Sequence, residues 1–448
     1  MPSTGNVRDA LLDVGFWHGS VAAANAILQK HPGLATGDIH IAALVGDDVA
    51  VRRFVTADSQ SVHARTGPRR VDPLTSLCFS VYLQHDHTRS DAFVRAATLL
   101  LDTGANPNTG FFDDGHQPNP TWESALYGAA GVAHHAALTK LLLDRGADPN
   151  DDEVPYHSPE TWDNGACRVL VESGKLNDSS LKMMLLRKTD WHDYDGIKLL
   201  LDHGVDPNGM SRFGKTALHN AVISDNRIEI VELLLDRGAD PRIVAADLRH
   251  GGSFRVGRSS TAAAVRRGRT DILAAIERRG LPLDLGAADR LIAAGAKGDA
   301  ALVQRIATDD PALAAQVVAD GSSLIAEFAG NNNSTGVDLL IDLGVPVDAR
   351  YEGDPYYDVA ENSTALHVAA WRMAHDTVDL LVRRGADVNA RDAKGRTPLM
   401  RAVTACVASY WSERRSPRSV RTLLAAGASR DGVVSPSGYD AVDALLAS

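Results

Sequence analysis

Histidine and aspartate gather in two segments that could bind a metal ion or transfer protons. One is the run His85–His87, and the other contains Asp113, Asp114 and His116. Imidazole and carboxylate groups side by side can hold zinc or a non-haem metal, or act as acid and base. Neither segment has the fixed spacing of HExxH, which is absent. We therefore interpret both as polar loops, expect no metal and no cofactor, and keep His116 as a candidate binding residue.

Aromatic side chains are scarce, at 5% of the residues. Most of them fall in the predicted connecting hairpins or at the ends of predicted first helices. Tryptophan and tyrosine anchor protein interfaces because they bury a large area at little cost in rotamer entropy. An alternative is that these rings only pack the undersides of long loops. The aromatic residues that we predict to contact a ligand are Phe112, Trp122, Trp191, Phe213, Tyr356, Tyr357, Trp371, Tyr410 and Trp411.

A local excess of arginine lies in the middle of this acidic chain. Arg212, Arg266 and Arg267 belong to it, and Arg372 follows Trp371 further on. Guanidinium groups would suit an acidic peptide, a phosphate or a carboxylate ligand. A solvated helix face is the plainer interpretation of such a charge run. The sequence thus leaves open an acidic partner and an ordinary polar surface.

Composition narrows the class of protein. The chain has 448 residues, 44% of them hydrophobic and 23% charged, with a formal net charge of -11. A general nucleic-acid or membrane-surface protein needs an excess of Lys and Arg, so we expect neither partner. Three distant cysteines and the lack of a signal-like or membrane-spanning apolar run predict a reducing cytoplasm. No P-loop, GxGxxG, GxSxG or CxxC motif supports an enzyme.

Residues 364–390 show the element that must position these side chains. Leu366, Ala369 and Ala370 form the apolar stripe of one short helix, and Val378 lies on the stripe of a second helix that Gly385 ends. Glycine adopts the left-handed conformation at a helix end without steric cost. Neither helix is long enough to be stable alone, so each must pack on the next copy. About twelve copies of this pattern follow one another.

The tetrads Thr216–His219 and Thr364–His367 open helices, and Gly-Ala-Asp-Pro/Val-Asn closes them, a pattern that resembles the ankyrin repeat. The resemblance implies an all-α ankyrin-repeat solenoid of about twelve helix pairs with short hairpin connections and several insertions. It also implies that His40, His219 and His367 bond locally to hold helix and turn together. We expect an N-terminal block at 1–150, an irregular repeat or hinge at 151–178 and a C-terminal block with a capping helix at 179–448.

Five insertions would enlarge the concave side on which ankyrin arrays hold their ligands. Two lie at 82–92 and 406–418 after first helices, two are the long hairpins 109–124 and 349–363, and one is 248–258. The resemblance places Trp371, Arg372, Arg266 and Arg267 at positions that vary with the ligand.

Three functions follow as expectations. The first is a non-enzymatic scaffold that holds a partner protein or peptide in the concave groove. In it, Trp371 and Tyr357 would contact the partner without contributing to stability. The second is a small-molecule-binding protein or unusual enzyme whose pocket the insertions close. The third is nucleic-acid binding through the arginine-rich middle, which the net charge argues against.

Overall fold

The computed structural model describes residues 4–115, 119–246, 257–409 and 411–447. Contacts divide the chain into two compact units, Met1–Arg212 (unit 1) and Phe213–Ser448 (unit 2). The boundary thus differs from the divisions expected at residues 150 and 178. Pro155 and its neighbours form only one helical turn, α11 (Val154–His157), but α11 packs on both sides within unit 1. This repeat is therefore short and irregular, and its role as a hinge stays a prediction.

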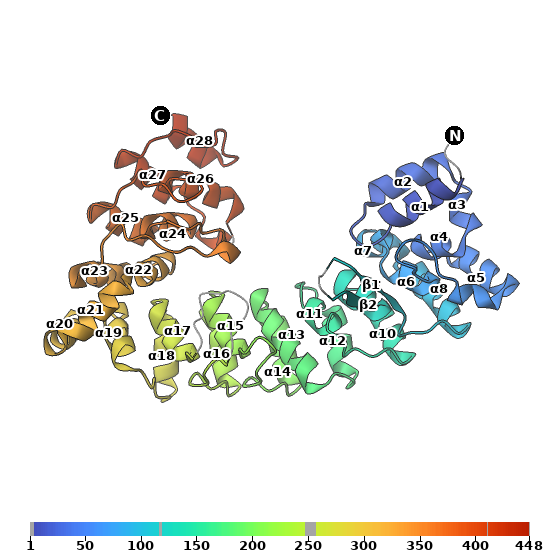
Figure 1. The fold of residues 1–448 in the computed structure, drawn as a ribbon, viewed down its shortest axis with the longest axis horizontal. Coiled ribbons are helices and arrows are strands. Elements are labelled where there is room, and N and C mark those ends of the chain that lie inside the picture. The colour runs from blue at the N-terminus through green and yellow to red at the C-terminus, as the bar shows by residue number, and fades with distance from the viewer. Residues whose placement is uncertain (1–3, 116–118, 247–256, 410, 448) are drawn as a thin grey trace. The chain divides into compact units, whose positions relative to one another are not determined.

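Unit 1 is a row of helix pairs in which first helices pack on first helices and second on second (Figure 1). Its first helices are α1 (Thr4–Val14), α4 (Ile39–Leu44), α6 (Pro73–Cys78), α9 (Ala125–Tyr127) continued by η3 (Gly128–Val132), α11 and α13 (Asp178–Asp190). Its second helices are α2 (Val21–Lys30), α5 (Asp48–Ala57), α8 (Ser90–Asp102), α10 (Ala136–Asp144), α12 (Gly165–Glu172) and α14 (Tyr194–Asp202). The connections contain α3 (Leu34–Gly37), η1 (Ser59–His63), α7 (Val81–His85) and η2 (His87–Arg89).

Unit 2 repeats this plan. Its first helices are α15 (Ala217–Ile223), α17 (Ser260–Arg266), α19 (Ala287–Ala296), α22 (Gly321–Gly330), α24 (Ala365–Trp371) and α26 (Pro398–Ala408). Its second helices are α16 (Ile228–Asp236), α18 (Thr270–Arg278), α20 (Ala300–Asp309), α23 (Ser334–Leu343), α25 (His375–Arg383) and α27 (Arg418–Ala425). The additional elements are α21 (Pro311–Ala319), η4 (Pro355–Tyr357), η5 (Ser412–Arg414) and the closing helix α28 (Asp440–Ala447). The described residues thus confirm an all-α solenoid of about twelve helix pairs.

Local hydrogen bonds explain why the repeat begins and ends where it does. The Thr216 backbone N–H donates to Nδ1 of His219 at 3.2 Å, and the His219 N–H donates to the Thr216 hydroxyl at 3.3 Å. Thr364 makes the same bond to His367, and Nε2 of His40 lies 2.8 Å from the Ala64 carbonyl. These contacts confirm the structural role that the resemblance implied for the three histidines, since each joins a helix to its neighbouring turn.

The two long hairpins are built differently. In unit 1, β1 (Gly110–Asp113) pairs antiparallel with β2 (Thr121–Ser124), so that Phe112 lies opposite Trp122. In unit 2, the hairpin 349–363 is held by isolated bridges between Tyr351 and Ser363 and between Asp354 and Val359. Residues 247–256, most of the expected insertion at 248–258, lie outside the described residues.

A helix needs about 20 predominantly apolar residues to span a bilayer. None of the described helices is both long enough and apolar enough to cross one by itself. The pair α21 and α22 meets the length and composition criteria only jointly, and it is bent by 66°.

Candidate functional site: a buried charge network and exposed aromatic side chains

Several predicted binding residues meet where three first-helix turns of unit 2 come together. Helix α22 packs on α17 as well as on α24, although α19 to α21 intervene between α17 and α22 in the sequence. Asp225 and Met373 adopt the left-handed conformation in the turns after α15 and α24, with φ of 53° and 52°. Arg267 precedes the corresponding glycine after α17. The three first helices thus end in the same kind of turn, and the packing of α22 on both α17 and α24 brings these turns together.

Asp225 is the centre of a buried charge network. Its carboxylate accepts hydrogen bonds from Nη2 of Arg267 and Nη1 of Arg372, both at 2.6 Å. The other side of Arg267 contacts Glu327 at 3.0 Å, and the Tyr351 hydroxyl donates to Glu327 at 3.3 Å. Burial alone would raise the pKa of Asp225, but the charges of the arginines hold it well below its usual range. The network therefore joins four repeats through charges that water does not screen.

Aromatic rings cover this network. The Arg372 guanidinium lies 5.2 Å from the Tyr357 ring and 4.9 Å from the Trp411 ring. The Trp371 indole N–H donates to the Tyr357 carbonyl at 2.8 Å, and Arg401 stacks on Trp371 at 3.8 Å. The long hairpin and the segment before η5 therefore fold back over α24 instead of extending a rim.

This packing corrects the expectation that these residues are open to a ligand. Trp371 is 4% exposed, Arg372 2%, Arg267 4% and Trp411 7%. Their positions would face solvent in a regular stack, but the approach of α22 to α17 and the two insertions enclose them. Tyr357 packs against the same cluster. The alternative, that aromatic rings pack the undersides of long loops, describes this group.

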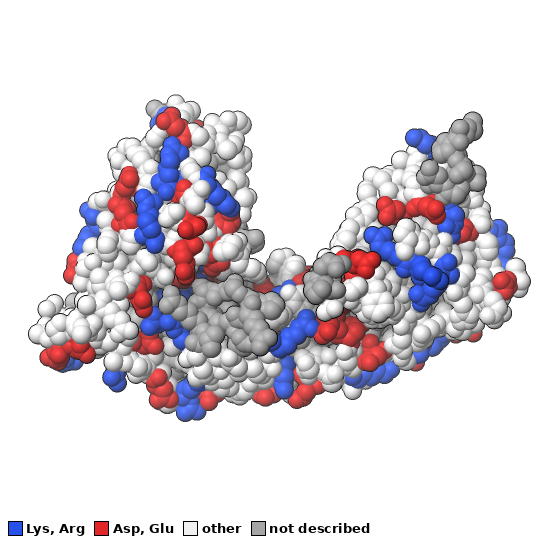
Figure 2. Space-filling model, in the orientation of Figure 1, with Lys and Arg blue, Asp and Glu red and all other residues white. Residues whose placement is uncertain are grey.

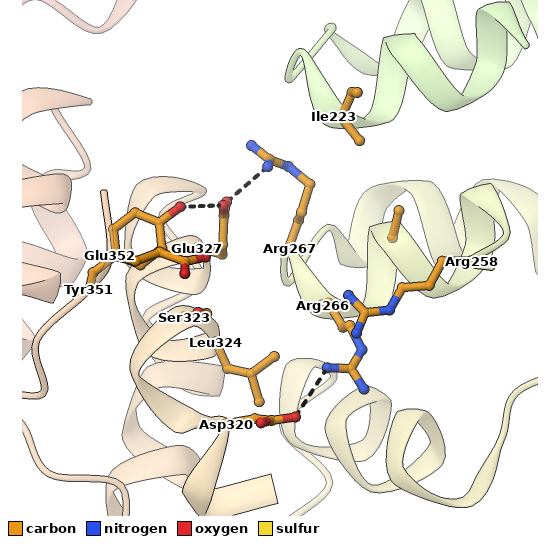
Figure 3. Close-up of a pocket in the computed structure, with 11 residues that line it drawn as sticks. Ile223, Arg258, Arg266, Arg267, Asp320, Ser323, Leu324, Glu327, Tyr351 and Glu352 are labelled. Carbon is orange, nitrogen blue, oxygen red and sulfur yellow. Dashed lines mark hydrogen bonds and ion pairs between the residues drawn. The ribbon is translucent and has the colours of Figure 1, made fainter. Parts of the chain in front are cut away.

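A pocket of about 60 Å³ lies beside the network (Figure 3). Arg266 and Arg267 line it together with Asp320, Glu327 and Tyr351. Figure 3 shows that Arg267 and Tyr351 both point to Glu327, while Arg266 points to Asp320. Nε of Arg266 also donates to Asp289 at 2.8 Å. Pockets for small molecules usually have several hundred Å³, so this one is too small for a typical small-molecule ligand.

Other predicted residues lie at the surface. Phe112 is 62% exposed and packs edge-on against Trp122, with ring centroids 4.9 Å apart. Tyr356 is 67% exposed. Trp191 contacts Trp162, which is 69% exposed.

The remaining candidates differ in their surroundings. Arg212 is exposed and bonds Asp152 at 2.6 Å, and Phe213 is half-buried in unit 2. His116 and Tyr410 lie outside the described residues. In the described parts of the chain, no group of three His, Cys, Asp or Glu residues could hold a metal ion.

Sequence reasoning missed the acidic members of the network and a titratable cluster in unit 1. Asp225 lies in a Ser-Asp-Asn turn, which marks a helix end but not a partner 147 residues away.

In unit 1, His157 lies between Glu153 at 3.0 Å and Glu160 at 2.8 Å. Burial lowers the pKa of His157, but the two carboxylates outweigh this effect and raise it to about 9. Burial, with Glu153 and Asp113 nearby, raises the pKa of Glu123 to about 8.

Both shifts predict that unit 1 loses stability as the pH rises. Glu123 and His157 hold their protons more tightly in the folded than in the unfolded chain. Their contribution is complete below the unfolded pKa values, about 4.3 and about 6.5, and is lost as the pH rises through about 8 and about 9. We expect Glu123→Gln to reduce the fall in the melting temperature over this range. Glu172→Gln, at an exposed carboxylate, is the control, and equal curves for both variants would contradict the assignment.

A family model described as ankyrin repeats in three copies matches residues 164–245, 291–392 and 325–430. A Dirofilaria immitis protein named L-asparaginase is 32% identical over 133 residues, which are 26% of this chain and 21% of that protein. An ankyrin repeat protein of Rickettsia bellii is 28% identical over 130 residues, 28% of this chain and 52% of its own.

The human ankyrin repeat and SOCS box protein 6 is 29% identical over 159 residues, 34% of this chain and 30% of that protein. The chain thus spans about half or less of each of these relatives. The crystal structure of the ankyrin repeat domain of Bcl-3 aligns with 24% identity and a TM-score of 0.21, covering 54% of this chain and 97% of that domain. With its opening Thr-Ala-Leu-His tetrads, its closing Gly-Ala-Asp-Pro/Val-Asn motif, its stacked helix pairs and the matching family model, the chain belongs to the ankyrin repeat proteins.

Proposed function

We propose that this ankyrin repeat protein is a non-enzymatic scaffold that holds a partner protein or peptide against its hairpins and first-helix ends. Ankyrin repeats in general mediate protein–protein interaction. The observation that supports the hairpin side is the position of most exposed hydrophobic residues. Phe112, Trp162, Val244, Tyr356 and Val407 lie in hairpins, in turns after first helices or near the end of a first helix, whereas Val49 lies on the second helix α5. Rings and apolar side chains that water surrounds are typical anchors of an interface.

The second helices present a different surface. Arg145, Arg279 and Arg384 follow the ends of α10, α18 and α25, and each bonds an aspartate at the end of the preceding second helix. These N–O distances are 2.7, 2.6 and 2.6 Å. Figure 2 accordingly shows basic and acidic residues interspersed. Because the chain already pairs these charges between its own repeats, we assign recognition to the hairpin side.

The proposal also concerns the cellular location of the scaffold and the charge of its partner. We place the scaffold in the cytoplasm, which agrees with three cysteines that are free and buried. An acidic partner was expected from the arginines, but Arg266, Arg267 and Arg372 all bond carboxylates of the chain itself. These three guanidinium groups are therefore engaged within unit 2, and they do not support an acidic partner.

The double variant Phe112→Ser/Trp122→Ser tests the proposed surface. Phe112 is exposed and Trp122 is half-buried on the outer face of the hairpin, so we expect little change in the melting temperature. If they are anchors, partner capture from the native lysate should fall by a factor of about 10 or more, measured by quantitative mass spectrometry. Val49→Ser is the control, because Val49 is 75% exposed on the second helix α5. Equal capture by the double variant and the wild type would contradict the proposal.

A further inference from the structure

Two tryptophans of unit 1 form an open corner. The ring centroids of Trp162 and Trp191 are 5.2 Å apart, and their planes meet at 76°. The indole N–H of Trp162 donates to the backbone carbonyl of Trp191 at 2.9 Å. This bond fixes the angle between the rings although Trp162 is 69% exposed. The corner is thus formed before any ligand arrives, which reduces the entropy lost on binding.

The corner differs from other aromatic residues of this chain. Arg187 lies 4.1 Å from the Tyr156 ring, and Arg401 lies 3.8 Å from the Trp371 ring. Over Trp162 and Trp191, in contrast, the described part of the chain places no Lys or Arg side chain. A tryptophan face attracts a cation more strongly than the other aromatic rings do. The fold thus leaves open an aromatic surface of the kind that arginine occupies elsewhere in the same molecule.

Carboxylates lie in the segments that contain the two tryptophans. Asp163 is exposed beside Trp162, Glu160 precedes Trp162 by two residues, and Asp190 ends α13 next to Trp191. The cations of these segments are already engaged, because Arg187 bonds Glu160 and Asp190. Lys188 is buried against Asp193 at 2.8 Å. His157 also bonds Glu160. Asp163 therefore carries the negative charge that these cations do not balance, and this favours a cation over the rings.

We propose that the Trp162–Trp191 corner binds a Lys or Arg side chain from a basic segment of the partner. This inference depends on the proposed scaffold function and adds the partner's chemistry to it. The cation lies over the indole faces while Asp163 balances its charge. The net charge of -11 draws a basic segment toward the protein over a longer range. A neutral side chain of the same length lacks both attractions and binds more weakly.

The test uses the full chain and two fluorescent peptides of equal length, one containing several lysines and the other the same sequence with every lysine acetylated. Fluorescence anisotropy measures their affinities. We expect the lysine peptide to bind at least about 10-fold more tightly than the acetylated one. Trp162→Ala should remove most of this difference, Trp162→Phe should retain part of it, and Asp163→Asn should weaken binding about 3-fold. Trp162 is exposed, so these variants should keep the wild-type melting temperature.

Two controls separate the corner from general charge attraction. Glu172→Gln removes an exposed carboxylate of α12, and Val49→Ser changes an exposed side chain of α5. Both should bind the lysine peptide as the wild type does. Equal affinity of the two peptides, or unchanged binding by Trp162→Ala, would overturn the inference. If that happened while the hairpin double variant still lost its partner from the lysate, the scaffold function would stand without the cation site.

Discussion

Replacing Asp225 with asparagine is expected to lower the free energy of unfolding by about 3–5 kcal/mol. The substitution leaves Arg267 and Arg372 in the interior without the carboxylate that both of them bond at 2.6 Å. A buried charge without a counter-charge is far more costly than the loss of an exposed pair. Equilibrium unfolding in urea of the full chain measures the change.

Asp236→Asn is the matched control for this prediction. Asp236 bonds Arg279 at 2.6 Å, but its side chain is 62% exposed, so the loss should stay below about 1 kcal/mol. If the two variants unfolded at the same urea concentration, the network would not hold the repeats together.

The dependence of stability on pH tests the role of Asp225 in a second way, with the same Asp225→Asn variant. Its folded pKa lies below the unfolded value, so its contribution to stability is complete above the unfolded pKa. The contribution is lost as the pH falls toward the folded value. Stability of the wild type should therefore fall more steeply than that of Asp225→Asn when the solution is acidified below about pH 4.

Trp371→Ala is expected to destabilise the chain by about 3–5 kcal/mol, as for other large buried aromatic residues. Trp371 is 4% exposed, packs in the cluster with Tyr351 and Trp411, and donates its N–H to the Tyr357 carbonyl. The substitution leaves a cavity and an unpaired carbonyl. The sequence alone predicts the opposite, namely weaker partner binding at unchanged stability.

Thermal and urea unfolding of Trp371→Ala, compared with Trp162→Ala, decide between these outcomes. Trp162 is exposed, so its removal should cost less than about 1 kcal/mol. A Trp371→Ala protein as stable as the wild type that no longer captured the partner would show that Trp371 is a contact residue after all.

The repeat architecture could be predicted because its signals are local. Thr216 and His219 are three residues apart, and Gly385 follows the stripe that it ends, so a short window contains each helix boundary. The exposure of Phe112 also has a local cause. Successive side chains of a strand point to opposite faces, and Phe111 occupies the buried one.

The interior position of Trp371 and Arg372 has no local signal. It depends on α22 packing against α17 across the intervening α19 to α21, and on the hairpin 349–363 folding over α24. Asp225 and Arg372 are 147 residues apart and meet only because of this arrangement. A sequence pattern identifies aromatic and charged residues at variable positions, but long-range packing decides which of them water reaches.

The most direct test of the account compares Phe112→Ser/Trp122→Ser with Trp371→Ala in one experiment that measures partner capture per folded molecule. Surface rings recognise the partner, whereas buried rings stabilise the fold. We therefore predict that the hairpin variant keeps its melting temperature and loses capture, whereas folded Trp371→Ala unfolds earlier but captures the partner normally. The reverse pattern, full capture by the hairpin variant and none by folded Trp371→Ala, would contradict it.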